Sequence, residues 1–307
     1  MEPRVVMVRR RTEYESLLRD HGTAQMAAFR LKQRGLSLDE VSLRHRLVQH
    51  AAEQVLGSVP VTWRKSWVLR EDLDRFPFTP EDIVVGVGLD GLVPNVAKYL
   101  EGQPVIGVNP FPKLAQKMMN FRPDQVAQLY SSGAPELEHR SMVAVEMDDG
   151  RTLIALNELF CGHRSHQSAK YDIDFDGVRE YQSSSGLIVA TGTGATGWAQ
   201  SIASTTGLEL SDLPNPTEPG VMFLIREAWA STFTGTDLLC GWVSPHCPLR
   251  ITCKMQEGGV IFGDGIESDH LAFGWGELAT FQVAARTLNL VVPGSTYTPW
   301  QTLLRPH

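Results

Sequence analysis

Apolar and polar residues follow two different patterns along the chain, and the change between them falls near residues 133–138. Before this point, the apolar runs 83–87 and 104–108 are joined by a segment whose apolar residues recur at helical spacing. A strand, a helix and a strand in this order form a βαβ unit, which predicts a doubly wound, mostly parallel sheet. After it, short apolar runs alternate with Gly and Asp turns, which predicts an antiparallel, β-rich domain. We therefore expect an α/β domain over residues 1–135 and a β-rich domain over residues 136–292.

The first part of the chain also predicts helices ahead of this βαβ unit. Residues 12–35 carry apolar positions at helical spacing and predict one helix. Ser37 and Glu40 form an S-x-x-E capping box, which predicts that a second helix begins there and runs to about residue 56. The run 59–63 predicts a strand.

In the second part, the turn residues Asp148-Asp149-Gly150 separate two apolar runs, 137–147 and 152–160, and predict a hairpin. The run 237–243 predicts another of the short strands. Acidic residues alternate along the strand near residues 172–176; a solvated edge and a cation site are both compatible with this pattern. The cysteines and histidines lack the C-x₂₋₄-C spacing of structural zinc sites, so we predict no metal ligands among the side chains.

Composition and charge narrow the class of protein. A chain of 307 residues with 42% hydrophobic residues can bury the core of one large or two medium domains. The net charge of −7 argues against a nucleic-acid partner, which would favour a basic face. No apolar run approaches the length of a membrane span, so we expect no membrane partner. Four cysteines in a chain of this length indicate reduced thiols and a cytoplasmic location.

The most distinctive segment is I-V-V-G-V-G-L-D-G-L, which begins at Ile83 and predicts a strand, a glycine turn and the start of a helix. Glycines let the backbone approach a phosphate, and a helix N-terminus favours negative charge. The glycines match the dinucleotide fingerprint G-x-G-x-x-G, and Gly88 to Gly91 also match G-x-D-G. A carboxylate in such a turn is unfavourable beside phosphate unless it binds a metal or takes a proton. The alternative is that Asp90 caps the next helix.

Three further motifs carry candidate chemistry. Gly107-Val108-Asn109 ends the next strand and should lie on the same sheet edge as Gly88–Gly91, because the carboxyl ends of parallel strands meet there. The loop Thr191–Trp198 offers hydroxyls, free N–H groups and one aromatic face, which suit phosphate, ribose or a ring. Asn157-Glu158 suits an adenine edge or ribose hydroxyls. A tight loop and a strand-end turn are the alternatives for the last two motifs.

Taken together and in this order, these motifs resemble those of the NAD kinase family. Ser244-Pro245-His246 and Asp264-Gly265 extend the resemblance, which covers roughly residues 80–292. The form of the segment from Ser184 to Trp198 is more similar to the mitochondrial-type branch than to the common bacterial one. The resemblance implies an α/β domain followed by a β-rich NAD-binding domain, with the tail, about residues 293–307, returning to the first domain.

The resemblance also implies an activity: phosphorylation of the 2′-hydroxyl of the adenosine ribose of NAD, with ATP as donor and Mg²⁺ as cofactor, to give NADP. Asp90 would stand in the position of the family's general base. A homodimer or homotetramer is implied as well. The residues implied in substrate or nucleotide binding are Gly88, Gly91, Asn109, Asn157, Glu158, Ser185, Thr193, Thr196, Gly197 and Trp198.

This sequence departs from the family pattern G-G-D-G-T in two places. Leu89 replaces a glycine and Leu92 replaces the threonine, which adds bulk and removes a hydroxyl donor. These departures favour an alternative, a non-catalytic dinucleotide-binding protein. A related lipid or sugar kinase is a second alternative, although no apolar groove or basic patch is evident in the sequence. A Rossmann dehydrogenase would want an acidic residue at the end of the next strand, where Asn109 stands instead.

Overall fold

The structure is a computed structural model that describes residues 2–132, 136–207 and 214–294. Contacts divide the chain into two compact units. Among the described residues, the first comprises those up to Glu138 and those from Asn289 onwards, and the second comprises those from His139 to Leu288. The predicted return of the tail to the first domain concerns residues that, from 295 onwards, lie outside the described part of the chain.

The first unit is built on a six-stranded sheet in the order β2-β1-β3-β4-β18-β5. The strands β2, β1, β3, β4 and β18 pair in parallel, as the βαβ pattern predicts. The bounds are β1 (Arg4–Arg9), β2 (Arg64–Leu69), β3 (Asp82–Val87), β4 (Pro104–Val108), β5 (Leu137–Arg140) and β18 (Leu288–Val291).

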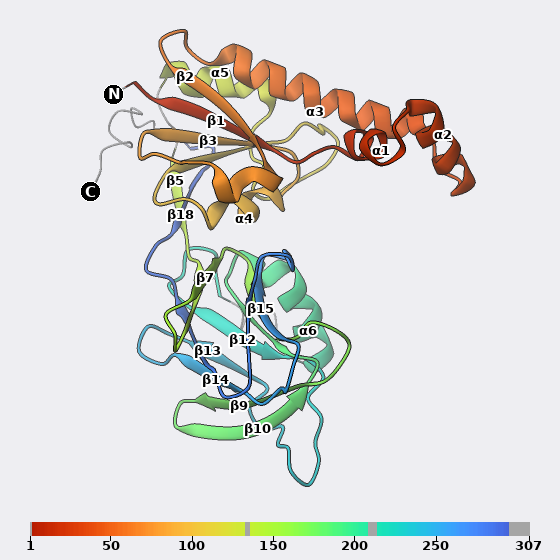
Figure 1. Cartoon of the computed structure of the whole chain (residues 1–307). Coiled ribbons are helices and arrows are strands. Elements are labelled where there is room, and N and C mark those ends of the chain that lie inside the picture. The colour runs from red at the N-terminus through yellow and green to blue at the C-terminus, as the bar shows by residue number, and fades with distance from the viewer. Residues whose placement is uncertain (1, 133–135, 208–213, 295–307) are drawn as a thin grey trace. The chain divides into compact units, whose positions relative to one another are not determined.

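Helices cover both faces of this sheet, which makes the unit doubly wound (Figure 1). Apolar side chains of α3 and α5 pack on one face against Val5, Ile83 and Ile106. On the other face, every residue of the short helix α4 is buried. The helical elements are α1 (Glu13–His21), α2 (Ala24–Gln33), α3 (Leu38–Ser58), the 3₁₀ helix η1 (Arg70–Arg75), α4 (Leu92–Ala97) and α5 (Pro123–Ser132).

Two predictions for the N-terminal helices are wrong in detail. Residues 12–35 form two helices rather than one, because Gly22 ends α1 at a φ of +76° and Thr23 caps the start of α2. The S-x-x-E pair does not form a capping box: the Ser37 hydroxyl accepts from the backbone N–H of Asp39 instead. A capping box does form one helix earlier, between Thr12 and Glu15.

The strand predicted over residues 59–63 is also wrong. This run makes a turn in which the backbone N–H of Trp63 donates to the carbonyl of Pro60. The strand β2 begins directly afterwards, at Arg64. It is an edge strand that begins with two exposed charged residues, Arg64 and Lys65, so the apolar pattern could not locate it.

The second unit consists of two six-stranded antiparallel sheets, in the orders β10-β9-β14-β17-β6-β7 and β13-β12-β11-β8-β15-β16. The first contains β6 (Val143–Met147), β7 (Thr152–Ala155), β9 (Ala169–Phe175), β10 (Val178–Ser184), β14 (Leu249–Cys253) and β17 (Leu278–Val283). The second contains β8 (Glu158–His163), β11 (Leu187–Ala190), β12 (Val221–Ile225), β13 (Cys240–Val243), β15 (Gly259–Gly263) and β16 (His270–Ala272).

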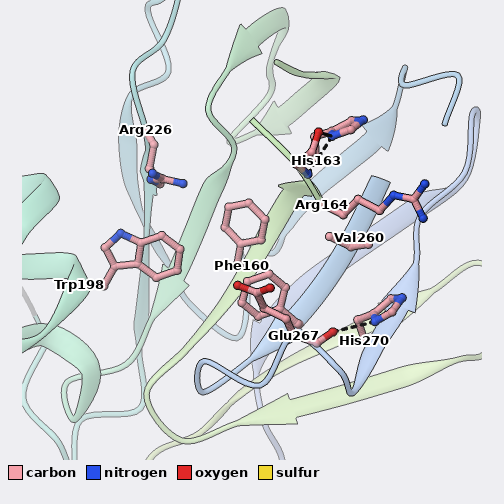
Figure 2. A pocket seen from close by; sticks show the side chains of 10 residues that line it. Phe160, His163, Arg164, Trp198, Arg226, Val260, Glu267 and His270 are labelled. Atoms are coloured by element: carbon pink, nitrogen blue, oxygen red, sulfur yellow. Dashed lines mark hydrogen bonds between the residues drawn. The ribbon is translucent and has the colours of Figure 1, made fainter. Parts of the chain in front are cut away.

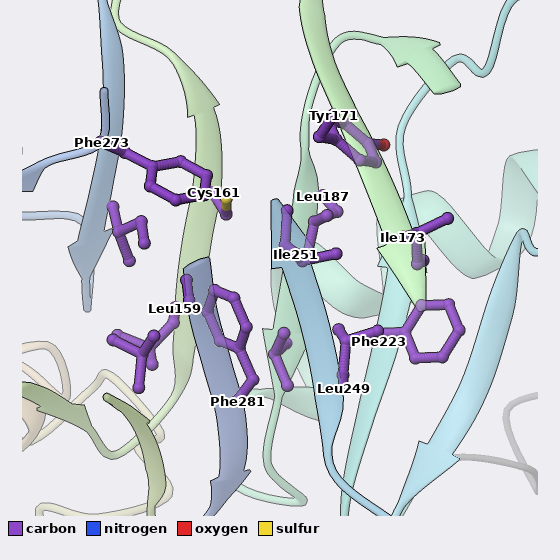
Figure 3. Packing of buried hydrophobic residues seen from close by; sticks show 14 of the residues in the cluster. Leu159, Cys161, Tyr171, Ile173, Leu187, Phe223, Leu249, Ile251, Phe273 and Phe281 are labelled. Atoms are coloured by element: carbon purple, nitrogen blue, oxygen red, sulfur yellow. The ribbon is translucent and has the colours of Figure 1, made fainter. Parts of the chain in front are cut away.

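The two sheets face each other across one apolar core (Figure 3). Tyr171 and Phe281 of the first sheet and Phe223 of the second are fully buried there. The outer face of the second sheet packs against α6 (Trp198–Thr206), which follows the short 3₁₀ helix η2 (Gly194–Thr196). This outer layer includes Phe160. The predicted fold class, a parallel α/β part followed by an antiparallel β-rich part, is thus confirmed.

The predicted hairpin is present, with β6 and β7 paired across the Asp148–Gly150 turn. The run 152–160 is nevertheless two strands, interrupted at Leu156 and Asn157, whose backbone N–H groups donate to the Asp264 carboxylate instead of to a neighbouring strand. The strand predicted over 237–243 begins only at Cys240. Within the described residues, no helix is long and apolar enough to cross a membrane.

The close packing of β4 against the loop that follows it gives a direct test of the first unit. A Cβ on Gly107 would overlap the carbonyl oxygen of Met118. We expect Gly107→Ala to lower the free energy of unfolding by at least about 2 kcal/mol in urea denaturation. Gly57→Ala is the matched control, because its Cβ meets nothing within 4 Å and the residue lies in α3. The control should be neutral or stabilising by up to about 1 kcal/mol; equal unfolding midpoints for the two variants would contradict this packing.

Candidate functional site

The predicted site residues of the first unit meet at the carboxyl edge of its sheet. Strands β3 and β4 pair in register up to Val87 and Val108, so Gly88 and Asn109 follow at adjacent positions. The backbone N–H of Gly88 donates to the carbonyl of Val108 at 3.1 Å. The prediction that these two segments share one rim is consistent with this pairing.

Asp90 is bound to the loop that follows β4. Its Oδ1 accepts from the backbone N–H groups of Met118 (2.8 Å) and Met119 (3.2 Å), and its Oδ2 accepts from that of Lys117 (2.8 Å). The Gln116 side chain closes the connection, because it accepts from the backbone N–H of Asp90 at 2.8 Å and donates to the carbonyl of Gly88 at 3.2 Å. Two carboxylate oxygens have about four lone pairs, so Oδ2 keeps one that no described group occupies.

The alternative in which Asp90 caps the following helix is wrong. Helix α4 has Gly91 at its N-cap, and no side-chain hydrogen bond caps it. The two leucines that depart from the family pattern have different surroundings. Leu92 is buried and its side chain lies beside Gly88, at 3.5 Å from where a Cβ on that glycine would stand. Leu89 is 47% exposed and lines a cavity. Leu92 therefore belongs to the core, whereas Leu89 is accessible from the cavity.

Asn109 supports the rim rather than pointing a free amide outward. Its Oδ1 accepts from the backbone N–H of Phe111 at 2.8 Å, and its Nδ2 donates to the carbonyl of Leu114 at 2.7 Å. Both bonds lie within the segment between β4 and the amides that hold Asp90. Asn109 therefore helps to shape the segment on which Asp90 depends.

In the second unit, the threonine-rich loop is held against the Asn157 segment. The Thr191 hydroxyl donates to the carbonyl of Leu156 at 2.5 Å and accepts from the backbone N–H groups of Thr193 (3.1 Å) and Gly194 (3.3 Å). A Cβ on Gly194 would overlap the carbonyl of Asn157. The close approach explains why the loop requires glycine here.

Two side chains in this assembly have properties typical of a binding site. Within the described residues, the buried Thr193 hydroxyl has no hydrogen-bond partner, which fits a group that awaits a ligand. Glu158 is buried at the start of β8, and burial together with the charge of Asp264 raises its pKa to about 7. The Asp264 carboxylate is held by the backbone N–H groups of Leu156 (3.0 Å) and Asn157 (2.7 Å). Glu158 thus changes charge near neutral pH.

Trp198 lines a cavity of about 390 Å³ on the outer face of the second sheet (Figure 2). Its ring stacks on Phe160 with centroids 5.7 Å apart and an interplanar angle of 13°. The Arg226 guanidinium lies 4.9 Å from the Trp198 ring centroid and donates to the carbonyl of Ser185 at 3.0 Å. The Ser185 hydroxyl donates to the carboxylate of Glu227. Arg226 therefore brings two predicted site residues, Ser185 and Trp198, into one cluster.

The other predicted residues of this loop are exposed: Thr196 and Gly197 lie at the surface, where a ligand can reach them. The described structure presents the predicted residues in two groups, one in each unit. Three residues with a structural part in these groups are not predicted from the sequence, because their contacts with the predicted residues form only in the folded chain. They are Gln116, which ties Asp90 to its loop, and Phe160 and Arg226, which flank Trp198. Asp264 contributes to the resemblance, but its carboxylate's contact with Asn157 is not predictable from sequence.

The alternating aspartates have a structural explanation. Asp172 pairs with Arg179 at 2.7 Å and with Lys254 at 3.3 Å. Asp176 lies in the turn between β9 and β10, at a φ of +50°. Among the described residues, no group of three or more His, Cys, Asp or Glu side chains could hold a metal ion.

Comparison with known proteins places this geometry in context. No protein-family model matches the chain. The chain is 36% identical over 132 residues to an NAD kinase of Psychrobacter arcticus, a match that spans 39% of this chain and 40% of that protein's length. It is 27% identical to the mitochondrial NAD kinase 2 of Rattus norvegicus over 84% of this chain and 82% of the relative.

A solved structure extends the comparison to the fold. The crystal structure of an NAD kinase from Archaeoglobus fulgidus in complex with ATP superposes with a TM-score of 0.58 at 17% identity, over 94% of this chain and 93% of that one. The two units therefore have the two-domain fold of the NAD kinases. The resemblance to NAD kinases predicted from the motifs is confirmed in sequence and in fold.

The raised pKa of Glu158 predicts a pH-dependent stability. In the unfolded chain the pKa returns to about 4.5, so the folded state binds the proton more tightly. The contribution of the protonated Glu158 carboxyl to the free energy of unfolding is fully present below pH 4.5. It is lost as the pH rises through 7. The loss amounts to up to about 3 kcal/mol. Urea unfolding of the wild type and Glu158→Gln at pH 5 and pH 8 measures it: the variant should gain relative stability at the higher pH.

Glu146→Gln is the matched control for this measurement. Glu146 lies in β6 of the same unit and is exposed, so its substitution removes an equal charge without changing a buried group. Its stability relative to the wild type should be the same at pH 5 and at pH 8. A parallel change in both variants, or none in Glu158→Gln, would contradict the assignment to Glu158.

Proposed function

We propose that this protein is an NAD kinase that transfers the γ-phosphoryl group of ATP to the 2′-hydroxyl of the adenosine ribose of NAD, giving NADP. The observation that carries the proposal is Asp90, whose carboxylate is held by three backbone N–H groups in a glycine loop at the carboxyl edge of the parallel sheet. Such an arrangement fixes the direction of a carboxylate and leaves a lone pair on Oδ2.

In the proposed reaction, Asp90 orients the 2′-hydroxyl and accepts its proton. The oxygen of that hydroxyl forms a bond to the γ-phosphorus while the bond from phosphorus to the β–γ bridging oxygen breaks, and ADP leaves. The proton goes to the free lone pair of Oδ2. Gly88 and Gly91 carry no side chain that would keep phosphate away from the backbone.

The second unit supplies the proposed NAD site. Asn157 and Glu158 hold the adenosine part through its ribose and base edges. The Thr193 hydroxyl, which lacks a partner among the described residues, supports this role because a ligand oxygen would complete its bonding. Thr196 and Gly197 add exposed donors, and Trp198 with Ser185 forms the part of the pocket that takes a ring.

We include Mg²⁺ in the proposal. In phosphoryl transfer, Mg²⁺ binds mainly to substrate phosphates and water, with one or two protein carboxylates. When bound with ATP, the ion neutralises charge that develops on the transferring phosphoryl group.

A second candidate is a non-catalytic dinucleotide-binding protein. The observation that favours it is the buried side chain of Leu92, which fills the place of a hydroxyl donor beside Gly88. Under this candidate Asp90 serves only to hold residues 117–119. NAD binding without consumption of ATP would distinguish it.

The proposal also includes a cytoplasmic location and a homodimeric or homotetrameric state. Support for the location comes from the four cysteines, all of which are free thiols. Cys161 and Cys253 are buried parts of the core. The oligomeric state rests on the family resemblance, and size-exclusion chromatography with light scattering measures it.

Replacing Asp90 tests the proposed catalytic role. We expect Asp90→Asn to lower kcat for NADP formation by about 10²–10⁴-fold, as loss of a general base or orienting carboxylate does, while the Kd for NAD stays within about twofold. A coupled assay for NADP and a calorimetric titration with NAD measure the two quantities. Full activity of the variant would contradict the role of Asp90.

Gln116→Ala is the matched control, because it loosens the same loop without removing the carboxylate. Its kcat should fall by less than about tenfold. If Gln116→Ala and Asp90→Asn lose activity equally, Asp90 acts by holding the loop and the base role is wrong.

A further inference from the structure

A cavity of about 430 Å³ lies in the first unit beside the loop that carries Asp90. Gly88 and Leu89 of that loop form part of its wall. Its charged lining is dominated by arginine: Arg10, Arg11, Arg44 and Arg70 face two glutamates, Glu13 and Glu71. A hollow with this excess of positive charge attracts anions, whereas the chain as a whole has a net charge of −7.

The register of the sheet explains how these residues come together. Arg9 of β1 is the partner of Leu69 in β2 and of Val87 in β3. Arg10, Arg70 and Gly88 are therefore the first residues beyond the carboxyl ends of three adjacent parallel strands. This edge is where open α/β sheets bind their ligands.

The arginines of the cavity are poorly neutralised by the protein itself. In the part of the chain that the structure describes, Arg10, Arg11 and Arg70 form no ion pair, and Arg44 has an exposed one with Glu13 at 3.2 Å. The neighbouring Arg9, by contrast, is paired with Glu15 at 2.8 Å. Partial desolvation and the positive charge of Arg70 lower the pKa of Arg10, and the negative charge of Glu71 offsets part of this effect. Like charges held together in this way destabilise the fold until an anion neutralises them.

We propose, on the basis of the kinase function above, that Arg10, Arg11 and Arg70 bind the phosphate chain of the phosphoryl donor in this cavity. Guanidinium groups bind phosphate oxygens through paired, charge-assisted hydrogen bonds. These arginines supply hydrogen-bond donors beside the glycine loop, where Leu92 stands in place of the family's threonine and its hydroxyl. Donor recognition thus rests on side-chain charge more than on the glycine loop.

The ligand class is a polyphosphate chain, and two sources share this chemistry. Inorganic polyphosphate would need the arginines alone. A nucleoside triphosphate would add a base, for which the cavity offers Phe111 and the apolar side chains of Val41 and Val48. Calorimetry with ATP and with tripolyphosphate separates them: ATP binding at least about tenfold tighter identifies the nucleotide, and equal affinities identify the phosphate chain as sufficient. Either result supports the binding of a phosphate chain in this cavity.

The test uses metal-free sodium tripolyphosphate and the full chain. Each arginine removed should weaken binding about tenfold, so Arg10→Gln/Arg70→Gln should lose about a hundredfold. Arg46→Gln is the control, because it removes one arginine from an exposed position of α3 outside the cavity. It should bind within about twofold of the wild type, apart from a small general charge effect. Equal binding by the wild type and the double variant, or an equal loss per charge in the control, would overturn the proposal.

Two further measurements separate a ligand role from a structural one and this site from the kinase function. Without anion, the double variant should unfold at the same temperature as the wild type or higher, because repulsion is relieved; a lower midpoint would overturn the ligand role. Unchanged NADP formation in the double variant would refute the role of the cavity in binding the phosphoryl donor and would leave the kinase function intact. Tripolyphosphate binding that depends on the arginines, with no NADP formed by the wild type, would refute the kinase function and leave the anion site.

Discussion

The in-register parallel pairing of β2, β1, β3 and β4 is the constraint on which the first unit depends. It delivers Arg70, Arg10, Gly88 and Asn109, the residues that follow the four strands, to one edge of the sheet. The strands themselves are held by apolar packing of α3 and α5, so the chemistry at the edge is separated from the residues that stabilise the sheet. A shift of one residue in any pairing would remove a group from this edge.

In the second unit, side-chain oxygens replace a neighbouring strand as hydrogen-bond acceptors. The Asp264 carboxylate accepts from the backbone N–H groups of Leu156 and Asn157. The Thr191 hydroxyl accepts from the backbone N–H groups of Thr193 and Gly194 in its own loop. The strand therefore breaks, and Glu158 is left buried beside a second carboxylate. Burial of an ionisable group against a like charge is unfavourable for folding, and binding sites are where such arrangements are found.

Much of the fold and part of the site could be predicted from the sequence. The glycine turn before Asp90 and the threonine-rich loop are local patterns, and local patterns determine local structure. The roles of Gln116 and Arg226 could not be predicted, because each acts on a residue more than twenty positions away through a contact that only the folded chain creates. The capping alternative for Asp90 failed for the same reason: its carboxylate bonds to residues 117–119, which the register of β4 brings near.

The most direct test of the account is to follow the transferred phosphate. The protein would be incubated with Mg²⁺, unlabelled NAD, and ATP that carries a radioactive γ-phosphate. The products would then be separated and treated with a phosphatase specific for the 2′-phosphate. The account predicts that label appears in NADP, one phosphate per molecule, and is released by that phosphatase. Label found only in inorganic phosphate or remaining in ATP, with NAD bound but unchanged, would contradict it and leave a dinucleotide-binding protein.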